Sequence, residues 1–203
     1  MKTPKIDWKK NAGLVPAIVQ DATTLQVLML GYMNAAALKQ TLATKRVTFF
    51  SRSKQRLWTK GESSKNFLHL VSLAVDCDQD TLLIKARPDG PTCHRGTPSC
   101  FGDEGATGAG FLAHLDQVVA GRLKSRDQSS YPVRLALEGV ARVAQKVGEE
   151  GVETALAAVG ASQADFTGEA ADLLYHLIVL LRVKKLSLGA AIAVLEKRHA
   201  PKK

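Results

Sequence analysis

A glycine-rich segment divides this chain of 203 residues into two parts with different hydrophobic patterns. Residues 101–110 read FGDEGATGAG and carry four glycines. A regular helix or strand is costly there, because glycine loses more backbone entropy on ordering than other residues. We therefore predict a linker at about 102–110. We assign residues 1–104 to a first domain, 105–110 to the glycine-rich linker and 111–203 to a second domain.

The first domain has the mixed pattern of strands and turns. Runs rich in β-branched, aromatic and alternating apolar residues predict strands at 47–50, 67–75 and 81–86. One helix is expected from Asn34 towards Leu42, because an asparagine at the N-cap can accept a hydrogen bond from the first helical amides. The pattern predicts an α+β domain that is rich in strands.

The second domain has apolar residues at three- and four-residue spacing, which is the period of a helix. Helices are predicted at 111–124, 132–159, 166–183 and 187–199, with Ser187 as the cap of the last one. Four helices of this length form an all-α bundle. Because so small a bundle covers little apolar surface by itself, part of that surface is expected to be buried against a second copy.

Composition and charge disfavour several classes of protein. A net charge of +9 favours anionic partners. Aromatic residues make up only 5% and no dense Lys/Arg block occurs, so a small anionic ligand is favoured over nucleic acid. The longest nearly apolar run, Leu173–Leu181, is far shorter than the roughly 20 residues that cross a bilayer. The N-terminus lacks the apolar stretch of an export signal, so we expect a cytoplasmic protein.

Carboxylates and thiols form the first candidate site. In an extended segment alternate side chains share a face, so Asp76, Asp78 and Asp80 can converge while Cys77 points away. Carboxylate oxygens suit Mg²⁺ and thiolates suit Zn²⁺. Three cysteines leave a tetrahedral zinc one position for water, as in catalytic sites, and they are Cys77, Cys93 and Cys100. The alternative is a plain hairpin turn at 78–79, with Cys77 a buried core thiol.

Carboxylates at helical spacing form a second candidate site. Glu150 and Glu153 lie three residues apart, which places them on one helix face, and Glu149 is adjacent. Glu169 and Asp172 form a second such pair. If the two helices are antiparallel, the pairs meet, and their repulsion calls for a cation such as Mg²⁺ or Mn²⁺ that holds a polyphosphate. A solvated acidic helix face is the alternative.

Two further groups of residues are open to both a binding and a structural interpretation. Lys146 precedes the carboxylates by one helical turn, where it could reach a phosphate or remain a surface lysine. Residues 51–64 combine hydroxyls and cations that suit phosphate with Trp58, which could stack on a base. A charged hairpin explains this stretch equally well.

Taken in order, the motifs of this chain resemble those of two enzyme families. The resemblance to phosphoribosyl-AMP cyclohydrolase covers about residues 11–103. The motifs that carry it are GYMN at 31–34, FSRS at 50–53, LWTKGE at 57–62, DCDQD at 76–80, GPTCH at 90–94 and SCF at 99–101. Those similar to phosphoribosyl-ATP pyrophosphatase, a relative of the all-α nucleotide pyrophosphohydrolases, are KVGEEGVE at 146–153 and EAADLLYH at 169–176. Together they resemble the bifunctional histidine-biosynthesis enzymes of bacteria.

The resemblance implies two hydrolytic activities. The second domain would hydrolyse phosphoribosyl-ATP to phosphoribosyl-AMP and pyrophosphate, with Mg²⁺ or Mn²⁺ held by Glu150, Glu153, Glu169 and Asp172 and with Glu149 as an additional candidate. The first domain would then open the N1–C6 bond of the adenine ring of phosphoribosyl-AMP by a zinc-bound hydroxide, since zinc lowers the pKa of bound water to about 7. Zinc would be held by Cys77, Cys93 and Cys100, and magnesium by Asp76, Asp78 and Asp80.

The resemblance also implies roles for other residues and an assembly. His94 is the expected proton-transfer group because it adjoins a zinc cysteine, and Glu62 is its rival. The family takes its zinc cysteines from two subunits, which implies a homodimer with a shared zinc site. Lys65 stands where the family commonly has glycine, so substrate affinity is expected to change more than mechanism. Expected substrate contacts are Trp58, Lys60, Ser63, Ser64, Arg52 and Lys146.

Two other functions remain open on sequence grounds. One is a nucleotide house-cleaning pyrophosphohydrolase with an inactive first domain, which the complete set of cysteines and aspartates disfavours. The other is a zinc-dependent RNA-binding protein, which the absence of basic clusters disfavours. We therefore expect small-molecule nucleotide substrates, and we expect neither nucleic acid nor a membrane as a partner.

Overall fold

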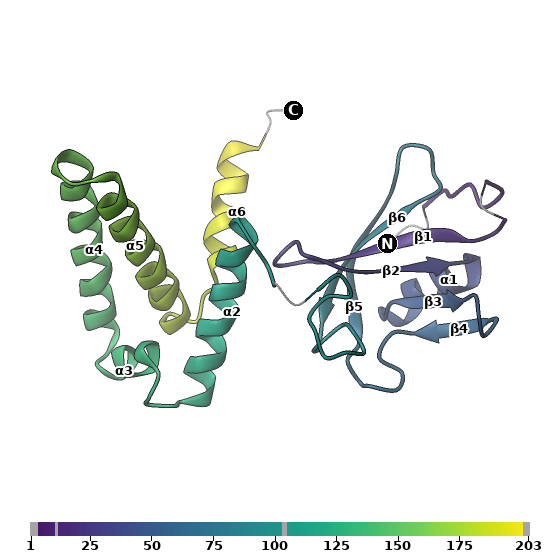
Figure 1. Ribbon diagram of the computed structural model, residues 1–203, viewed down its shortest axis with the longest axis horizontal. Coiled ribbons are helices and arrows are strands. Elements are labelled where there is room, and N and C mark those ends of the chain that lie inside the picture. Colours follow the sequence, from purple (N-terminus) through teal and green to yellow (C-terminus); the bar gives the residue numbers. More distant parts are fainter. Residues whose placement is uncertain (1–3, 11, 103–104, 201–203) are drawn as a thin grey trace. The chain divides into compact units, whose positions relative to one another are not determined.

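The computed structural model describes residues 4–10, 12–102 and 105–200. Its internal contacts divide the chain into two compact units, Met1–Phe111 and Leu112–Lys203 (Figure 1). The first unit is built mainly from strands and the second from helices, and each has a hydrophobic core of its own. This order of an α+β part followed by an all-α part is the one predicted from the hydrophobic pattern.

A four-stranded sheet with the order β2-β1-β6-β5 is the frame of the first unit. β1 runs antiparallel to β2 and parallel to β6, and β5 runs antiparallel to β6. Alternate residues of the central strand β1 are fully buried in the core. The strands are β1 (Val15–Asp21), β2 (Val27–Met33), β5 (Leu68–Val75) and β6 (Leu82–Pro88).

The helix α1 (Ala35–Thr44) and the hairpin of β3 (Thr48–Ser51) and β4 (Arg56–Thr59) complete the first unit (Figure 1). The predicted cap of α1 is confirmed, because the Asn34 side chain accepts a hydrogen bond from the Ala37 amide at 2.8 Å. Gly31 lies against the ring of Phe49, which a Cβ at this position would overlap. The close packing of β2 on β3 therefore requires glycine here.

The strands predicted at 47–50, 67–75 and 81–86 correspond to β3, β5 and β6. The strands β1 and β2 were not predicted from the sequence. Each contains a residue that normally weakens a strand, Pro16 in β1 and Gly31 in β2. Both strands form nevertheless, because they contribute buried side chains to the core of the first unit: alternate residues in β1, and Leu28, Met29 and Met33 in β2.

The second unit contains five described helices where four were predicted. The single helix expected at 132–159 is wrong: Gly139 has a φ of 98°, which no helix accommodates, and it separates α3 from α4. Ser187 is confirmed as the cap of α6, since its hydroxyl accepts from the Ala190 amide. The helices are α2 (Ala109–Ser125), α3 (Tyr131–Leu137), α4 (Val140–Gly160), α5 (Gln163–Val183) and α6 (Leu188–His199).

Helices α4 and α5 pack against each other as an antiparallel pair, because only two residues connect them (Figure 1). A partly buried ion pair joins α2 to α5, in which Arg182 donates to the buried Asp116 at 2.6 Å. The core of the unit is small, with Val119, Leu135, Val143, Ile178 and Val179 as its buried members. Within the described part of the chain, no helix is long and apolar enough to cross a membrane.

The described part of the glycine-rich segment is more structured than a free linker. Gly105 and Gly108 both have positive φ values, and α2 begins at Ala109, two residues before the predicted start. Gly110, in the first turn of α2, lies so close to the carbonyl oxygen of Thr24 that a Cβ would not fit. Glycine is therefore needed at position 110 for this close approach.

Candidate functional site

The three aspartates expected to bind magnesium lie together at the turn between β5 and β6. One carboxylate oxygen from each lies within 4.8 Å of those from the other two. The predicted reason, an extended segment with alternating side chains, is wrong, because residues 76–80 form a turn in which Gln79 has a φ of 66°. Asp76 accepts hydrogen bonds from the amides of Thr81 and Asp80, which lower its pKa.

A lysine neutralises part of this aspartate cluster. The Nζ of Lys10 lies 2.9 Å from a carboxylate oxygen of Asp78 and 3.5 Å from one of Asp80. The hydrogen bond to Asp78 raises the pKa of Lys10. The turn therefore attracts a cation of the chain itself, as a cluster of like charges does.

Two of the three cysteines lie together, and the third lies elsewhere in the unit. Cys93 and Cys100 line the same pocket. Burial, followed by the neighbouring Cys93, raises the pKa of the Cys100 thiol, whereas the Arg95 amide lowers that of Cys93. Cys77 is exposed at the β5–β6 turn, so its interpretation as a buried core thiol is wrong. Among the described residues of one chain, the three thiols do not form one group.

A pocket of about 420 Å³ opens beside Cys93 and Cys100, a volume in the range of small-ligand sites. Its lining comes from the turn after β4 and from the loop after β6, two segments that are far apart in the sequence. Part of the stretch 51–64 forms the charged β3–β4 hairpin, and Trp58 and several residues after β4 line the pocket. Its polar and aromatic lining includes Trp58, Lys60, Glu62, Ser63, Ser64 and His94.

Both candidates for proton transfer lie at this pocket in different environments. Glu62 forms an ion pair with Arg56, and the hydrogen bond from Arg56 lowers the pKa of Glu62. At neutral pH this carboxylate is therefore ionised, and the ion pair makes it a weaker base than a free glutamate. His94 lies beside a cysteine, with Nδ1 3.8 Å from the sulfur of Cys93.

Lys60 is buried, which lowers its pKa, and the two cysteines oppose this shift.

Two residues named from the sequence lie outside the lining of this pocket. The guanidinium of Arg52 stacks on the ring of Tyr32, 3.9 Å from its centre. Lys65 follows Ser63 and Ser64 and has a φ of 64°. This left-handed conformation favours glycine, which is the residue that the resemblance leads one to expect at position 65.

In the second unit, three of the predicted carboxylates meet between two helices. Glu150 on α4, with Glu169 and Asp172 on α5, each offer an oxygen within 4.8 Å of the other two. Glu153 lies outside this group. Burial raises the pKa of Glu169, and the charges of Glu153, Glu150 and Asp172 raise it further. The antiparallel arrangement expected from the sequence therefore brings like charges together.

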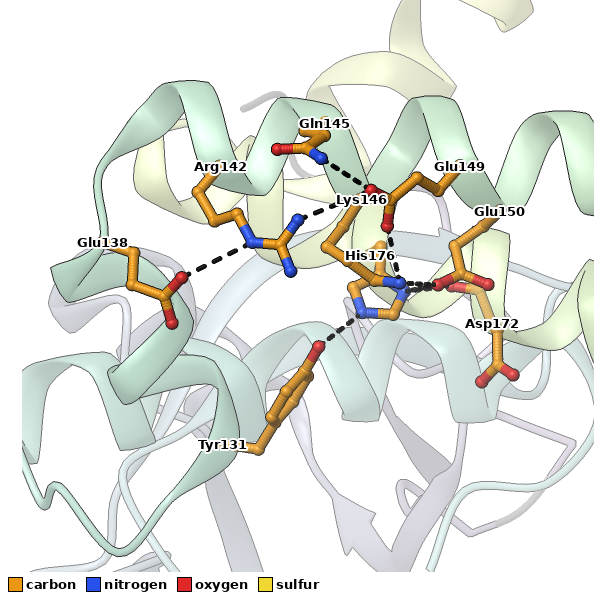
Figure 2. Close-up of polar contacts among 9 residues, drawn as sticks. All are labelled: Tyr131, Glu138, Arg142, Gln145, Lys146, Glu149, Glu150, Asp172 and His176. Atoms are coloured by element: carbon orange, nitrogen blue, oxygen red, sulfur yellow. Dashed lines mark hydrogen bonds and ion pairs between the residues drawn. The ribbon is translucent and has the colours of Figure 1, made fainter.

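Lys146 lies within this acidic cluster. Its Nζ is 2.7 Å from Glu150 and 3.0 Å from Glu149 (Figure 2). Glu149 is also bound by Gln145 at 2.7 Å and by Arg142 at 3.4 Å, and its hydrogen bond to Lys146 lowers its pKa. Glu149 thus positions the lysine and lies outside the three-carboxylate group. The hydrogen bonds to Glu150 and Glu149 raise the pKa of Lys146 well above its usual range.

Two residues at this cluster, His176 and Tyr131, were not predicted from the sequence to belong to the site. His176 is buried, and its two ring nitrogens contact Asp172, Glu150 and Tyr131 (Figure 2). The available signal was the four-residue spacing from Asp172 to His176, which places both on one helix face. No sequence signal connects Tyr131 with them, because 45 residues separate it from His176.

Comparison with known proteins identifies both units. The family model for phosphoribosyl-AMP cyclohydrolase matches residues 29–102, and that for phosphoribosyl-ATP pyrophosphohydrolase matches residues 112–199. The histidine biosynthesis bifunctional protein HisIE of Xanthomonas campestris pv. campestris is 60% identical over 96% of this chain and 93% of its own length. The protein of the same name from Escherichia coli (strain K12) is 56% identical over 96% of each chain.

The fold, the sites and these matches define a two-domain hydrolase with a separate candidate centre in each unit. The chain belongs to the family of bifunctional histidine-biosynthesis enzymes, in which a phosphoribosyl-AMP cyclohydrolase domain precedes a phosphoribosyl-ATP pyrophosphohydrolase domain.

Proposed function

We propose that this chain catalyses two consecutive steps of histidine biosynthesis. The second unit hydrolyses phosphoribosyl-ATP to phosphoribosyl-AMP and pyrophosphate, and the first unit opens the adenine ring of phosphoribosyl-AMP. The observation that carries the proposal is that each family model falls on a unit with its own carboxylate cluster. A house-cleaning pyrophosphohydrolase with an inactive first unit is not favoured, since the first unit keeps its pocket and its cysteines.

The donor atoms of the first unit fit the metals expected there. Cys93 and Cys100 offer adjacent thiols, which suit zinc, and the aspartates of the β5–β6 turn offer oxygens, which suit magnesium. Cys77 lies apart from the other two thiols, so we propose that Cys77 of the partner subunit completes the set in a homodimer. Zinc bound there would supply a water activated at neutral pH.

The residues of the pocket bind the substrate and move protons. Trp58 offers a face for the adenine base, and Lys60, Ser63 and Ser64 offer donors for phosphate. The reaction adds water across the N1–C6 bond: oxygen bonds to C6, the N1–C6 bond breaks, and N1 gains a proton. We propose His94 for the proton transfer, with Glu62 as the rival, because both line this pocket.

The donor atoms of the second unit fit Mg²⁺ or Mn²⁺. Glu150, Glu169 and Asp172 offer clustered carboxylate oxygens, with Glu153 close enough to influence the charge of Glu169. A divalent ion held there would neutralise charge on the phosphates during hydrolysis between the α- and β-phosphates. Lys146 is the residue proposed to contact a substrate phosphate once a divalent ion balances the carboxylates.

The cytoplasm is the proposed compartment. All three cysteines are free thiols in the structure, and zinc binds thiolates. A reducing compartment keeps such thiols available.

The proposal is tested by mass spectrometry of the products formed from phosphoribosyl-ATP with Mg²⁺ and Zn²⁺. We expect wild type to give the ring-opened product, Cys93→Ala to accumulate phosphoribosyl-AMP, and Glu169→Gln to leave phosphoribosyl-ATP. Loss of a proposed ligand is expected to slow its own step by about 100-fold or more. As the matched control, Glu169→Gln should still open the ring of phosphoribosyl-AMP that is supplied directly.

The possible outcomes separate the two halves of the proposal. Phosphoribosyl-AMP accumulating with wild type would mean a pyrophosphohydrolase alone, and the cyclohydrolase half would be wrong. Untouched phosphoribosyl-ATP with wild type would contradict the pyrophosphohydrolase half.

A further inference from the structure

We propose that Tyr131 and His176 are positioning residues of the pyrophosphohydrolase site, which hold the carboxylate of Glu150 in the orientation that binds the divalent ion. The inference rests on the function proposed for the second unit. Neither residue belongs to the carboxylate group itself. They form a chain of contacts that reaches Glu150 from a third helix (Figure 2).

The hydrogen bonds of His176 fix the ring in one orientation. Its Nδ1 lies 2.9 Å from the backbone carbonyl oxygen of Asp172 and 3.5 Å from Oε1 of Glu150. The Asp172 carbonyl can only accept, so Nδ1 carries a proton and donates it there, and the longer contact of 3.5 Å places the same edge of the ring beside Glu150. In the neutral ring Nε2 is then an acceptor, and it receives the hydroxyl of Tyr131 at 3.0 Å.

Packing aims the Tyr131 hydroxyl at this ring. Tyr131 is the first residue of α3, and its ring stacks on Tyr175 with 6.2 Å between the centroids. It meets His176 edge-on at 5.9 Å. The side chains of His176 and Glu150 are each only 7% exposed, so neither has room to turn into solvent. The contacts therefore connect α3, α4 and α5 through one buried carboxylate.

Lys146 and His176 contact the same oxygen of Glu150, but the lysine side chain has more conformational freedom than the imidazole. Both contacts, at 2.7 and 3.5 Å, are made to Oε1, and Oε2 receives neither of them. The ammonium of Lys146 sits on a flexible stem and can give way to a divalent ion. The imidazole is held at both nitrogens and stays in place. A partner of this kind orients a metal ligand, and its loss typically costs 10–100-fold in metal affinity.

The test measures Mn²⁺ binding to the full-length protein by electron paramagnetic resonance. We compare wild type with Tyr131→Phe, which removes only the hydroxyl, and with His176→Gln and His176→Asn. We expect Tyr131→Phe to weaken Mn²⁺ binding by about 3- to 10-fold and His176→Gln by about 10- to 100-fold. His176→Asn should retain more affinity, because its amide nitrogen can replace the Nδ1 donor.

Two controls separate positioning from general damage. Tyr175→Phe removes a hydroxyl from the same aromatic cluster, but Tyr175 makes neither of the hydrogen bonds to the His176 nitrogens. The Mn²⁺ affinity of the Tyr175→Phe variant should therefore match that of wild type. The Mg²⁺ concentration for half-maximal pyrophosphohydrolase activity should rise in Tyr131→Phe far more than kcat at saturating Mg²⁺ falls. The cyclohydrolase activity of the same samples should stay unchanged.

Each other result overturns a defined part of the inference. Glu169→Gln should remove one bound Mn²⁺ per chain. If it does, and Tyr131→Phe and His176→Gln bind Mn²⁺ as wild type does, the positioning role is wrong and the metal site stands. Equal weakening in Tyr175→Phe and Tyr131→Phe would also contradict positioning by the hydroxyl. If Glu169→Gln removes no bound Mn²⁺, the metal site proposed for this cluster is wrong, and the positioning role that depends on it is wrong as well.

Discussion

Among single residues, Arg56 offers a way to distinguish Glu62 from His94 as the proton-transfer group of the first unit. Its hydrogen bond to Glu62 holds the pKa of that carboxyl below the ordinary value, so Glu62 remains ionised to lower pH. Arg56 makes no contact of this kind with His94 among the described residues. Removing the guanidinium therefore changes the pKa of Glu62 and leaves the surroundings of His94 unchanged.

We predict that Arg56→Met raises the pKa of Glu62 towards the value of about 4.3 for a free glutamate. If Glu62 accepts the proton, kcat/KM for ring opening will begin to fall at higher pH on the acidic side than in wild type, because the base is neutralised earlier. An acid limb that coincides with wild type would assign the step to His94. Arg46→Met is the control, since Arg46 stacks on Phe67 and is not among the expected substrate contacts.

At the same scale, the sequence predicted which carboxylates cluster better than it predicted their surroundings. The aspartates of the β5–β6 turn are close in the sequence, and Glu169 and Asp172 share a helix face, so their spacing revealed both groups. The pocket joins the loop after β4 to the loop after β6, and the Tyr131–His176 contact spans 45 residues. Such proximity depends on the fold and has no local signal.

Among the elements, the break between α3 and α4 shows where periodicity misleads. The apolar spacing continues across Gly139, and so one helix was predicted at 132–159. The backbone of Gly139, with φ 98° and ψ 164°, lies in a region that only glycine enters readily. By contrast, the caps Asn34 and Ser187 were predicted correctly, because a capping side chain acts within three residues of itself.

We predict that Gly139→Ala destabilises the second unit by about 1–3 kcal/mol. A Cβ at position 139 meets no atom within 4 Å, so the cost comes from backbone strain alone. Gly121→Ala is the matched control: it lies inside α2, also has open space at its Cβ, and should stabilise by about 0.5–1 kcal/mol. Urea unfolding followed by circular dichroism measures the change in the free energy of unfolding for each variant. Changes of the same sign in the two variants would contradict the interpretation.

For the whole molecule, the separation of Cys77 from the other two cysteines has the widest consequence. Each unit has its own core, yet one copy of the first unit does not bring the three thiols together. If the zinc site is shared between subunits, lesions in Cys77 and Cys93 can compensate each other in a heterodimer.

We predict that a heterodimer of Cys77→Ala and Cys93→Ala chains, isolated with two different tags, regains about half of the wild-type cyclohydrolase activity, because one of its two shared sites is intact. The control is a heterodimer of Cys93→Ala and Cys100→Ala chains, in which both sites are damaged and no recovery is expected. Pyrophosphohydrolase activity should be equal in all samples. A Cys77/Cys93 heterodimer as inactive as the control would disprove the shared site.

The lysine beside each acidic cluster has a consequence for how the enzyme matures. Lys10 lies against Asp78 and Asp80, and Lys146 against Glu149 and Glu150, so a tethered ammonium offsets the carboxylates in both units. A newly made chain therefore does not need a divalent ion to balance these charges while it folds. If the proposed ions bind, their loading is an exchange, in which the arriving ion replaces the ammonium and releases a lysine for other contacts.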